Sequence, residues 1–229
     1  MSMKFRLICA TRETREQFTA KTALGRSLQL FPFPFIELRL FPENSTGLPK
    51  LYNIALKEAE SDPAILIFIH DDVQLLDVFW PTHIVQGLDV FDVVGVVGNK
   101  RRLPAQPSWC FKDTQWNLDE HDVYLSGIVA HGSSWPATNV SFYGPTFERV
   151  KLLDGLLIAC RSETLIANKL FFDEDFDFHF YDMDFCRQAE VLNLRLGTWS
   201  ISTLHASEGQ LNQASWRSAY AKYLDKWGS

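Results

Sequence analysis

The sequence predicts an α/β fold with a mixed, mainly parallel sheet flanked by helices. Two observations favour this class. Residues 65–69 are five large apolar side chains in a row, the pattern of a strand that is buried on both faces. The chain also begins with strand-type residues at 5–10 followed by helix-type residues, and this order is typical of α/β folds. We therefore expect one central sheet with helices packed on it.

Length and charge limit the classes of function. The 229 residues fit a single domain, 1–229, and a composition of 46% hydrophobic and 22% charged residues is typical of a soluble globular protein. With 22 basic and 28 acidic side chains, the net charge of -6 disfavours a nucleic-acid or anionic-membrane partner. A phosphorylated small molecule is compatible with this charge, because a divalent metal can supply the positive charge.

The sequence also predicts a cytoplasmic protein without a membrane span. Arginines interrupt the apolar N-terminal stretch that a signal peptide needs, and no segment approaches the roughly 20 apolar residues of a transmembrane helix. The cysteines are far apart and form no CxxC pair, so we expect buried free thiols rather than a zinc site or disulfides. They are Cys9, Cys110, Cys160 and Cys186.

The first part of the chain alternates strands and helices. Residues 5–10 predict a strand, and Thr14 with Gln17 predicts a capping box for a helix to about residue 28. Residues 33–41 are interrupted by proline, which favours a strand at the edge of the sheet. Residues 48–60 have apolar side chains at helical spacing, with a proline in the first turn.

The start of the helix at 48–60 is a candidate anion site. Lys50 and Asn53 lie near its N-terminus, where backbone N–H groups favour phosphate. A solvent-exposed lysine and an ordinary polar residue of the first turn are the alternative interpretation of this pair.

The most informative stretch is the buried strand at 65–69 with the three residues that follow it. His70, Asp71 and Asp72 come directly after the strand, and open α/β folds bind their ligands at this carboxyl edge. Adjacent carboxylates repel each other, so they are usually matched by a cation or by hydrogen-bond donors. We interpret the stretch as a metal–nucleotide site, with a plain polar turn as the alternative.

The middle of the chain carries a basic run and a long irregular segment. Residues 81–88 predict a short helix, and residues 93–97 predict a strand that ends beside three basic residues, 100–102, which would meet a diphosphate or face solvent. Residues 103–148 lose the periodicity of the core and predict an irregular insertion with hairpins or a flexible flap. Its tryptophans, at positions 109, 116 and 135, suit either stacking on sugars or packing.

The last third of the chain returns to the core pattern. Residues 150–159 predict a strand that Asp154 and Gly155 interrupt. An acid beside a glycine in an apolar strand indicates that a ligand, a metal or a hydrogen-bond donor lies next to it. The alternative is a tight turn between two short strands. Ser162 is expected to cap a short helix to residue 170.

The C-terminal segments contain the remaining candidate residues. The acids at 173–177 predict an exposed loop, whereas Asp182 lies where a helix begins. Residues 198–204 predict a last strand that ends at His205, a metal ligand or a hydrogen-bonded core histidine. Aromatic residues at helical spacing within 216–227 predict the docking face of a final helix.

Five motifs in this order resemble those of the glycosyltransferase-like proteins related to family 2. That family has the GT-A fold, a Rossmann-like fold for nucleotide-diphospho-sugar transferases, and the motifs extend over nearly the whole chain. They are Leu48-Pro49-Lys50-Leu51-Tyr52-Asn53, Phe68-Ile69-His70-Asp71-Asp72-Val73, Leu153-Asp154-Gly155, Phe178-His179-Phe180-Tyr181-Asp182-Met183-Asp184-Phe185-Cys186, and His205 near Ser207.

The resemblance implies a metal-dependent, inverting glycosyltransferase that moves a hexosyl or related sugar from a nucleotide-sugar donor. Asp72 occupies the last position of the family's Asp-x-Asp motif and would coordinate Mn²⁺ or Mg²⁺, with His205 as a further metal ligand. Asp182 is similar to the family's general base, which takes the proton of the acceptor hydroxyl. The resemblance and the helix start together imply the donor- or acceptor-binding residues Lys50, Asn53, Asp71, Asp154 and Gly155. The acceptor, a saccharide, lipid-linked or small molecule, is expected to meet the 103–148 insertion.

Three features depart from the family's pattern. His70 stands in place of the first Asp of Asp-x-Asp, and Tyr181 stands where the family often has Glu. The Asp-Asp-x-Ser signature that contacts the base is missing, so Glu43 or Asn44 would have to replace it and the nucleotide stays unassigned. The departures favour, as the alternative, a nucleotide-sugar-binding module of the same fold without transferase activity. A metal phosphohydrolase of the His-Asp type fits poorly, because those enzymes are helical.

Overall fold

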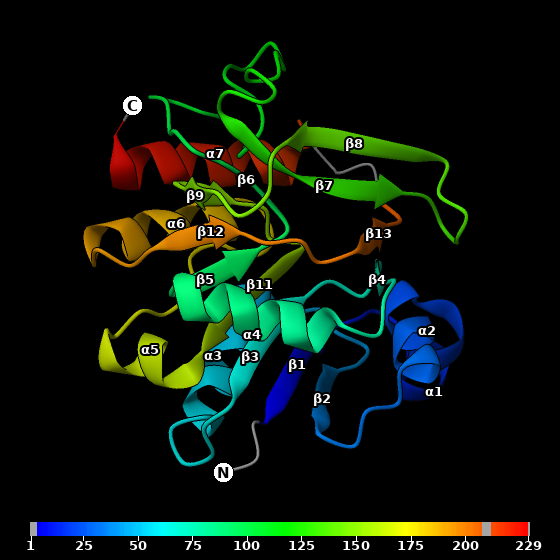
Figure 1. The fold of residues 1–229 in the computed structure, drawn as a ribbon. Helices are drawn as coiled ribbons and strands as arrows, with labels where there is room; N and C mark the ends of the chain where they lie inside the picture. Colours follow the sequence, from blue (N-terminus) through cyan, green and yellow to red (C-terminus); the bar gives the residue numbers. More distant parts are fainter. Residues whose placement is uncertain (1–3, 208–211, 229) are drawn as a thin grey trace.

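The computed structural model describes residues 4–207 and 212–228, which form two sheets with helices around them (Figure 1). The larger sheet contains, in spatial order, β2 (Ile36–Phe41), β1 (Phe5–Ala10), β3 (Ile65–Ile69), β11 (Leu157–Arg161), β5 (Val93–Gly95), β12 (Leu196–Thr198) and β9 (Arg149–Val150). The smaller sheet contains β10 (Leu152–Leu153), β6 (Val97–Asn99), β7 (Leu125–His131), β13 (Thr203–His205) and β4 (Val73–Leu75), and β8 (Asn139–Gly144) pairs with β7.

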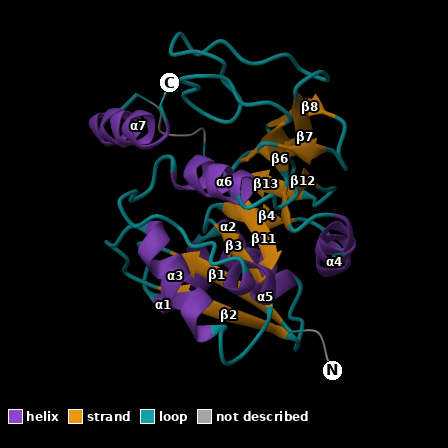
Figure 2. Cartoon of the chain, turned by 90° about the vertical axis from the view of Figure 1, so that its left-hand side faces the viewer, coloured by secondary structure: helices purple, strands orange, loops and turns teal. Residues whose placement is uncertain are grey.

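The larger sheet is mixed and covered by helices on both faces, which confirms the predicted α/β class. β1 pairs in parallel with β2 and β3, and β5 with β12, whereas β11 runs antiparallel to both β3 and β5, and β9 to β12. The sheet is therefore mixed but not mainly parallel as predicted, because β11 and β9 enter it from the opposite direction. Figure 2 shows α4 on one side of the strands and α3 and α6 on the other. The helices are α1 (Arg15–Lys21), α2 (Ala23–Leu30), α3 (Leu48–Glu58), α4 (Trp80–Val90), α5 (Ser162–Ala167), α6 (Tyr181–Val191) and α7 (Ala214–Trp227).

The central strand β3 is buried along its whole length. Every side chain of β3 is at most 3% exposed, because β1 and β11 flank it and helices cover both faces. This confirms the prediction from the five apolar residues in a row. β3 delivers His70, Asp71 and Asp72 to the edge of the sheet.

The two sheets are joined where the chain leaves one and enters the other. β3 continues through residues 70–72 into β4, and β10 continues through residues 154–156 into β11. The backbone N–H of His70 donates to the carbonyl oxygen of Leu156 at 3.1 Å, so these two crossings lie side by side. The polar residues of both crossings are thereby brought together at the seam between the sheets.

Three segments that predict single strands are instead divided by changes of sheet. Residues 93–97 form β5 and β6, residues 150–159 contribute to β9, β10 and β11, and residues 198–204 contribute to β12 and β13. The first two predictions are wrong because an apolar run can stay buried through a change of sheet, as at Val96, which is 1% exposed. In the third segment, residues 199–202 lie between β12 and β13 and belong to neither strand. Asp154 and Gly155 lie between two short strands, the alternative considered for them.

The N-terminal helices and α5 differ from prediction at their caps. The Thr14 capping box is confirmed, but the helix expected to residue 28 ends at Lys21, because the Thr22 side chain accepts from the N–H of Gly25 and caps a second helix. The strand expected from residue 33 begins at Ile36, at the sheet edge as predicted. Ser162 is not the N-cap of α5 but its first residue, and its hydroxyl accepts a hydrogen bond from the backbone N–H of Ala64.

The segment 103–148 combines an irregular part with the expected hairpin. Residues 103–124 contain only an isolated bridge, between Phe111 and Leu118, whereas β7 and β8 pair in antiparallel fashion. β7 lies between β6 and β13 in the smaller sheet, and its Leu125 and Val129 are buried. The hairpin is therefore built into the second sheet.

Other predictions concern the cysteines, the membrane and the acidic loop. All four cysteines are free and buried, as predicted. Within the residues that the structure describes, no helix has both the length and the apolar character of a membrane span. Residues 173–177 form a largely exposed loop, as predicted, although Phe176 is buried and Asp173 pairs with Lys226.

The final helix docks on the domain through the face that the aromatic spacing predicts. Trp216 and Tyr223 of α7 are buried and pack against Phe180, at ring-centroid distances of 5.4 and 5.2 Å. Near its end, Trp227 Nε1 donates to the fully buried Asp184 Oδ1 at 2.6 Å, and Lys226 Nζ lies 2.7 Å from the same oxygen. One buried carboxylate thus ties α7 to α6.

Replacement of this carboxylate is expected to destabilise the fold. Asp184→Ala leaves Trp227 Nε1 and Lys226 without their shared acceptor and should lower the free energy of unfolding by about 2 to 3 kcal/mol. Urea unfolding followed by tryptophan fluorescence measures this change. Asp225→Ala, which removes an exposed carboxylate of α7, should change stability by less than about 0.5 kcal/mol. Equal stability of the two variants would contradict the prediction.

Candidate functional site

A cleft of about 970 Å³ opens at the seam between the two sheets, beside the carboxyl ends of β1 and β3. Most of the predicted site residues line it, although they come from four distant segments of the chain. These are Asp71, Asp72, Asp154, Gly155, Asp182 and His205. Lys50 and Asn53 do not belong to this lining.

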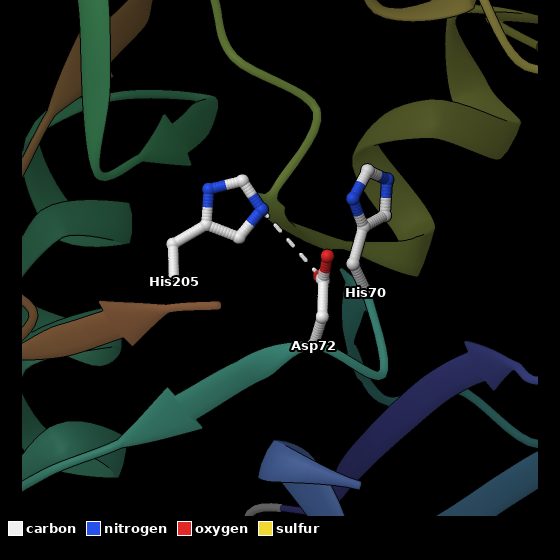
Figure 3. Close-up of side chains that lie close together, drawn as sticks. All are labelled: His70, Asp72 and His205. Atoms are coloured by element: carbon white, nitrogen blue, oxygen red, sulfur yellow. Dashed lines mark ion pairs between the residues drawn. The ribbon is translucent and has the colours of Figure 1, made fainter. Parts of the chain in front are cut away.

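Three of the lining side chains form a group that can hold a metal ion. One ligand atom each from His70, Asp72 and His205 lie within 4.8 Å of one another. Figure 3 shows His205 and one ring nitrogen of His70 facing Asp72 from two sides. The dashed line in that view marks the ion pair between His205 Nε2 and Asp72 Oδ1, at 3.5 Å.

The register of the smaller sheet explains why His205 meets Asp72. β13 runs antiparallel to β4, and His205 is the partner of Val73 in this pairing. The backbone N–H of Ala206 also donates to the carbonyl oxygen of Asp72 at 3.0 Å. Two residues that are far apart in sequence are thereby fixed across one ladder, so both side chains face the same point.

The group has the chemistry that a divalent metal requires. Asp72 Oδ1 is buried and accepts no hydrogen bond from the described residues. Burial raises the pKa of Asp72, but the neighbouring His205 and His70 outweigh it and hold this pKa below the usual range. A buried, ionised oxygen without a hydrogen-bond donor is costly unless a cation lies beside it. The carboxylate and the imidazoles therefore fit a metal such as Mn²⁺.

The two histidines have different electrostatic environments. Burial lowers the pKa of His70, which favours the neutral imidazole. Burial also disfavours protonation of His205, but the adjoining carboxylate of Asp72 more than offsets this and raises the pKa of His205. Of the two histidines, His205 is therefore the one that is more readily protonated beside Asp72.

Asp71 points to a different neighbour from Asp72. Its Oδ2 accepts a hydrogen bond from the Thr11 hydroxyl at 2.6 Å, at the end of β1. Burial raises the pKa of Asp71, the Thr11 hydrogen bond opposes this, and the charge of Asp72 adds to the increase. Asp71 thus belongs to the part of the cleft formed by the ends of β1 and β2, which Asn44 also lines.

Asp182 is placed at the first turn of α6 as a partly exposed acid with a raised pKa. Burial and then the charge of Asp154 raise the pKa of Asp182 to about 7, although hydrogen bonds from the N–H groups of Met183 and Gly155 lower it in part. Those bonds measure 2.8 Å to Oδ1 and 3.0 Å to Oδ2. An acid with this pKa can accept a proton near neutral pH.

Asp154 is held by groups of the protein itself. Trp109 Nε1 donates to its Oδ2 at 2.6 Å, and the backbone N–H of Leu156 donates to its Oδ1 at 2.9 Å. The carboxylate lines the cleft, and its charge raises the pKa of Asp182. Trp109 is 7% exposed and therefore packs beside the cleft from the irregular segment.

Gly155 is required by a close approach of Tyr181. A Cβ atom at position 155 would lie 2.3 Å from the Tyr181 hydroxyl oxygen. That hydroxyl donates to the carbonyl oxygen of Gly155 at 2.9 Å and also lies 2.8 Å from His70 Nε2. The glycine therefore makes room for Tyr181, whose hydroxyl contacts His70 of the possible metal-binding group.

The remaining sequence candidates lie elsewhere or are already paired. Lys50 is exposed on α3, and the Asn53 amide bonds both backbone groups of Phe172, at 2.8 and 3.0 Å. The basic run 100–102 forms ion pairs with Glu148, Asp119 and Glu190, outside the cleft lining. Neither the start of α3 nor the basic run therefore contributes residues to the cleft lining.

Three contacts of the cleft carry no clear signal in the sequence. Thr11 and Trp109 lie in segments without a motif, and their partners are 60 and 45 residues away. The only hint of the Tyr181–His70 hydrogen bond is that both residues depart from the family's pattern.

Comparison by sequence identifies one family. The family described as "Glycosyltransferase like family" has a model that matches residues 42–216, which include all of the cleft residues discussed above except those of the β1 end. No curated protein matches the chain.

Comparison by structure identifies proteins of similar fold at low identity. TarS of S. aureus, residues 1–349, is 15% identical with a TM-score of 0.46, over 90% of this chain and 59% of that chain. GalNAc-T7 with UDP, GalNAc and Mn²⁺ has a TM-score of 0.54 at 10% identity, over 98% and 48%. The mannosyltransferase PcManGT of Pyrobaculum calidifontis with GDP-Man and Mn²⁺ has a TM-score of 0.53 at 13% identity, over 96% and 61%. The chain thus spans about half to three fifths of these proteins.

Proposed function

Because the chain belongs to the glycosyltransferase-like family and has the GT-A fold, we propose that it is a metal-dependent, inverting glycosyltransferase. The donor is a nucleotide-diphospho-sugar and the acceptor is a hydroxyl group. The observation that carries this proposal is the cleft in which a metal-binding group and an acid with a pKa of about 7 face the same space. UDP bound to GalNAc-T7 and GDP-Man bound to PcManGT, two proteins of similar fold, support the donor class.

Asp72 and His205 would hold the metal at the end of β3. Asp72 Oδ1, which is buried and accepts no hydrogen bond from the described residues, supports this assignment, as does the Mn²⁺ in two structures of similar fold. When bound, Mn²⁺ or Mg²⁺ neutralises charge on the departing diphosphate. The ends of β1 and β2, with Asp71 and Asn44, offer polar groups to the rest of the nucleotide.

Asp182 would act as the general base. Its carboxylate takes the proton of the acceptor hydroxyl while that oxygen attacks the anomeric carbon and the bond to the diphosphate breaks. A single displacement of this kind inverts the anomeric centre. Asp154 is held by Trp109 and Leu156, so in this proposal it contributes its charge and lines the sugar site with Gly155 rather than taking the proton.

A donor panel tests the proposal directly. Calorimetric titration with UDP-, GDP-, CMP- and dTDP-sugars, with Mn²⁺ and with EDTA, should show binding of at least one donor that requires the metal. Mass spectrometry of incubations with saccharide and small-molecule acceptors, and with a lipid-linked acceptor, should then show a glycosylated product. Binding without transfer to any acceptor and without donor hydrolysis would instead favour a nucleotide-sugar-binding module. Absence of metal-dependent binding throughout the panel would overturn the proposal.

The raised pKa of Asp182 predicts the pH dependence of transfer. The base must be ionised, and a pKa of about 7 means that the ionised fraction grows as pH rises through 7. We therefore expect kcat/KM to increase about tenfold per pH unit below 7 and to level off above it. Initial rates between pH 5.5 and 8.5 measure this profile.

Asp154→Asn provides the control for this profile. It removes the neighbouring charge that raises the pKa of Asp182, so the inflection should move to lower pH. An inflection that stays in place in this variant would assign the titration to another group.

A further inference from the structure

Two residues that depart from the family's pattern touch each other in the cleft. His70 replaces the first Asp of Asp-x-Asp, and Tyr181 stands where the family often has Glu, 111 residues further along the chain. His70 Nε2 lies 2.8 Å from the Tyr181 hydroxyl oxygen. The contact indicates that the two departures form one unit.

The position of a single proton determines which nitrogen of His70 is free. The Tyr181 hydroxyl has one proton, and its oxygen lies 2.9 Å from the carbonyl oxygen of Gly155. A carbonyl oxygen can only accept, so the hydroxyl donates its proton to this bond. With its proton used there, the Tyr181 oxygen must accept the other hydrogen bond from the Nε2–H of His70. A neutral His70 therefore carries its proton on Nε2 and has its lone pair on Nδ1.

The geometry directs that lone pair toward the metal group. In Figure 3 one ring nitrogen of His70 faces Asp72 and His205, and the other points away from them. Since Nε2 is the atom bound to Tyr181, the nitrogen that faces the group is Nδ1. Phe178 stacks on the imidazole at a centroid distance of 5.7 Å, which further restricts the ring.

We propose that His70 Nδ1 is a third protein ligand of the metal, that Tyr181 is the positioning residue that fixes this tautomer, and that the resulting ligand set favours Mn²⁺ over Mg²⁺. This rests on the metal site of the proposed function. Two imidazoles and one carboxylate suit first-row transition metals, whereas Mg²⁺ prefers ligands that are all oxygen. A hydrogen-bond partner that orients a ligating histidine typically contributes 10- to 100-fold in metal affinity.

Calorimetry with the free metals tests the ligand set without donor or acceptor. Wild-type protein should bind Mn²⁺ at least about tenfold more tightly than Mg²⁺, and Tyr181→Phe should weaken Mn²⁺ binding about 10- to 100-fold. Tyr220→Phe is the matched control, because the Tyr220 hydroxyl likewise donates to a backbone carbonyl, that of Ala105, but lies outside the cleft lining. Its Mn²⁺ affinity should equal that of the wild type.

A double-mutant cycle separates positioning from general damage. If Tyr181 acts through His70, Tyr181→Phe should cause no further loss of Mn²⁺ affinity in a His70→Ala background. His70→Asp should narrow the preference for Mn²⁺ over Mg²⁺, since it restores an oxygen ligand. A cycle in which the two losses simply add would overturn the positioning role, and an unchanged metal preference in His70→Asp would overturn the ligand role.

NMR of the histidine ring reads the tautomer in the metal-free protein. With ¹³C- and ¹⁵N-labelled histidine at pH 8, His70 should show the Nε2–H form in the wild type and a mixture in Tyr181→Phe. A predominant Nδ1–H form in the wild type would overturn the proposal. Metal binding that depends on Asp72 but not on His70 would refute this inference and leave the proposed transferase. Metal binding that depends on Tyr181, without sugar transfer, would support this inference and refute the proposed transferase.

Discussion

Asp182→Asn is expected to lower turnover about 100- to 10,000-fold while the affinity for the donor stays within about threefold of the wild type. The amide cannot take the proton of the acceptor hydroxyl, so turnover falls. Residue 182 lies at the start of α6 and is not one of the three possible metal ligands, so donor binding is retained. Steady-state rates with saturating donor and acceptor measure the loss, and calorimetry measures donor binding. The variant should also lose the rise of its residual rate through pH 7.

The control for this prediction lies in the same acid-rich segment. Asp175 is exposed and does not line the cleft, so Asp175→Asn should leave turnover unchanged. Because both Asp182 oxygens accept backbone N–H groups, thermal unfolding of Asp182→Asn must show a folded protein before its rate is interpreted. A folded Asp182→Asn variant with turnover near the wild type would exclude this residue as the base.

The sequence predicts elements well where periodicity and length agree, and poorly where the chain changes sheets. β1 spans the predicted residues 5–10, and α3 has its expected start and apolar face. The second sheet was not predicted, because β4, β6 and β13 have only three residues each, and β6 continues the apolar run that begins in β5. A run of this kind shows burial but does not show which sheet buries it.

Predicted residues that lie at the end of an element do line the cleft, whereas contacts between residues that are distant in sequence were not predicted. Asp72, Asp182 and His205 each lie at the end of a strand or the start of a helix, and such positions gather at one edge of an α/β fold. Asn53 also lies in a helix start, but its amide is bound to Phe172, a contact that local sequence does not encode. The role of Trp109 likewise depends on where an irregular segment folds back.

Asp72→Asn is expected to weaken Mn²⁺ binding by at least about 100-fold and to remove metal-dependent donor binding. Asp72 provides the only carboxylate in the group formed with His70 and His205 among the residues that the structure describes. Its Oδ1 is buried, and the neutral amide would no longer offset the charge of a divalent ion at that point. Calorimetric titration with Mn²⁺, and then with donor in excess Mn²⁺, measures both effects.

Asp71→Asn is the matched control for the charge change, because it removes the adjacent carboxylate. Asp71 bonds to Thr11 and lies outside the metal-binding group, so its replacement acts on the metal only through the loss of a nearby charge. We expect a loss of Mn²⁺ affinity below about tenfold. Equal losses in the two variants would mean that the pair attracts the metal by charge alone. A large loss in Asp72→Asn only would mean that one oxygen, held between two imidazoles by the β4–β13 register, coordinates it.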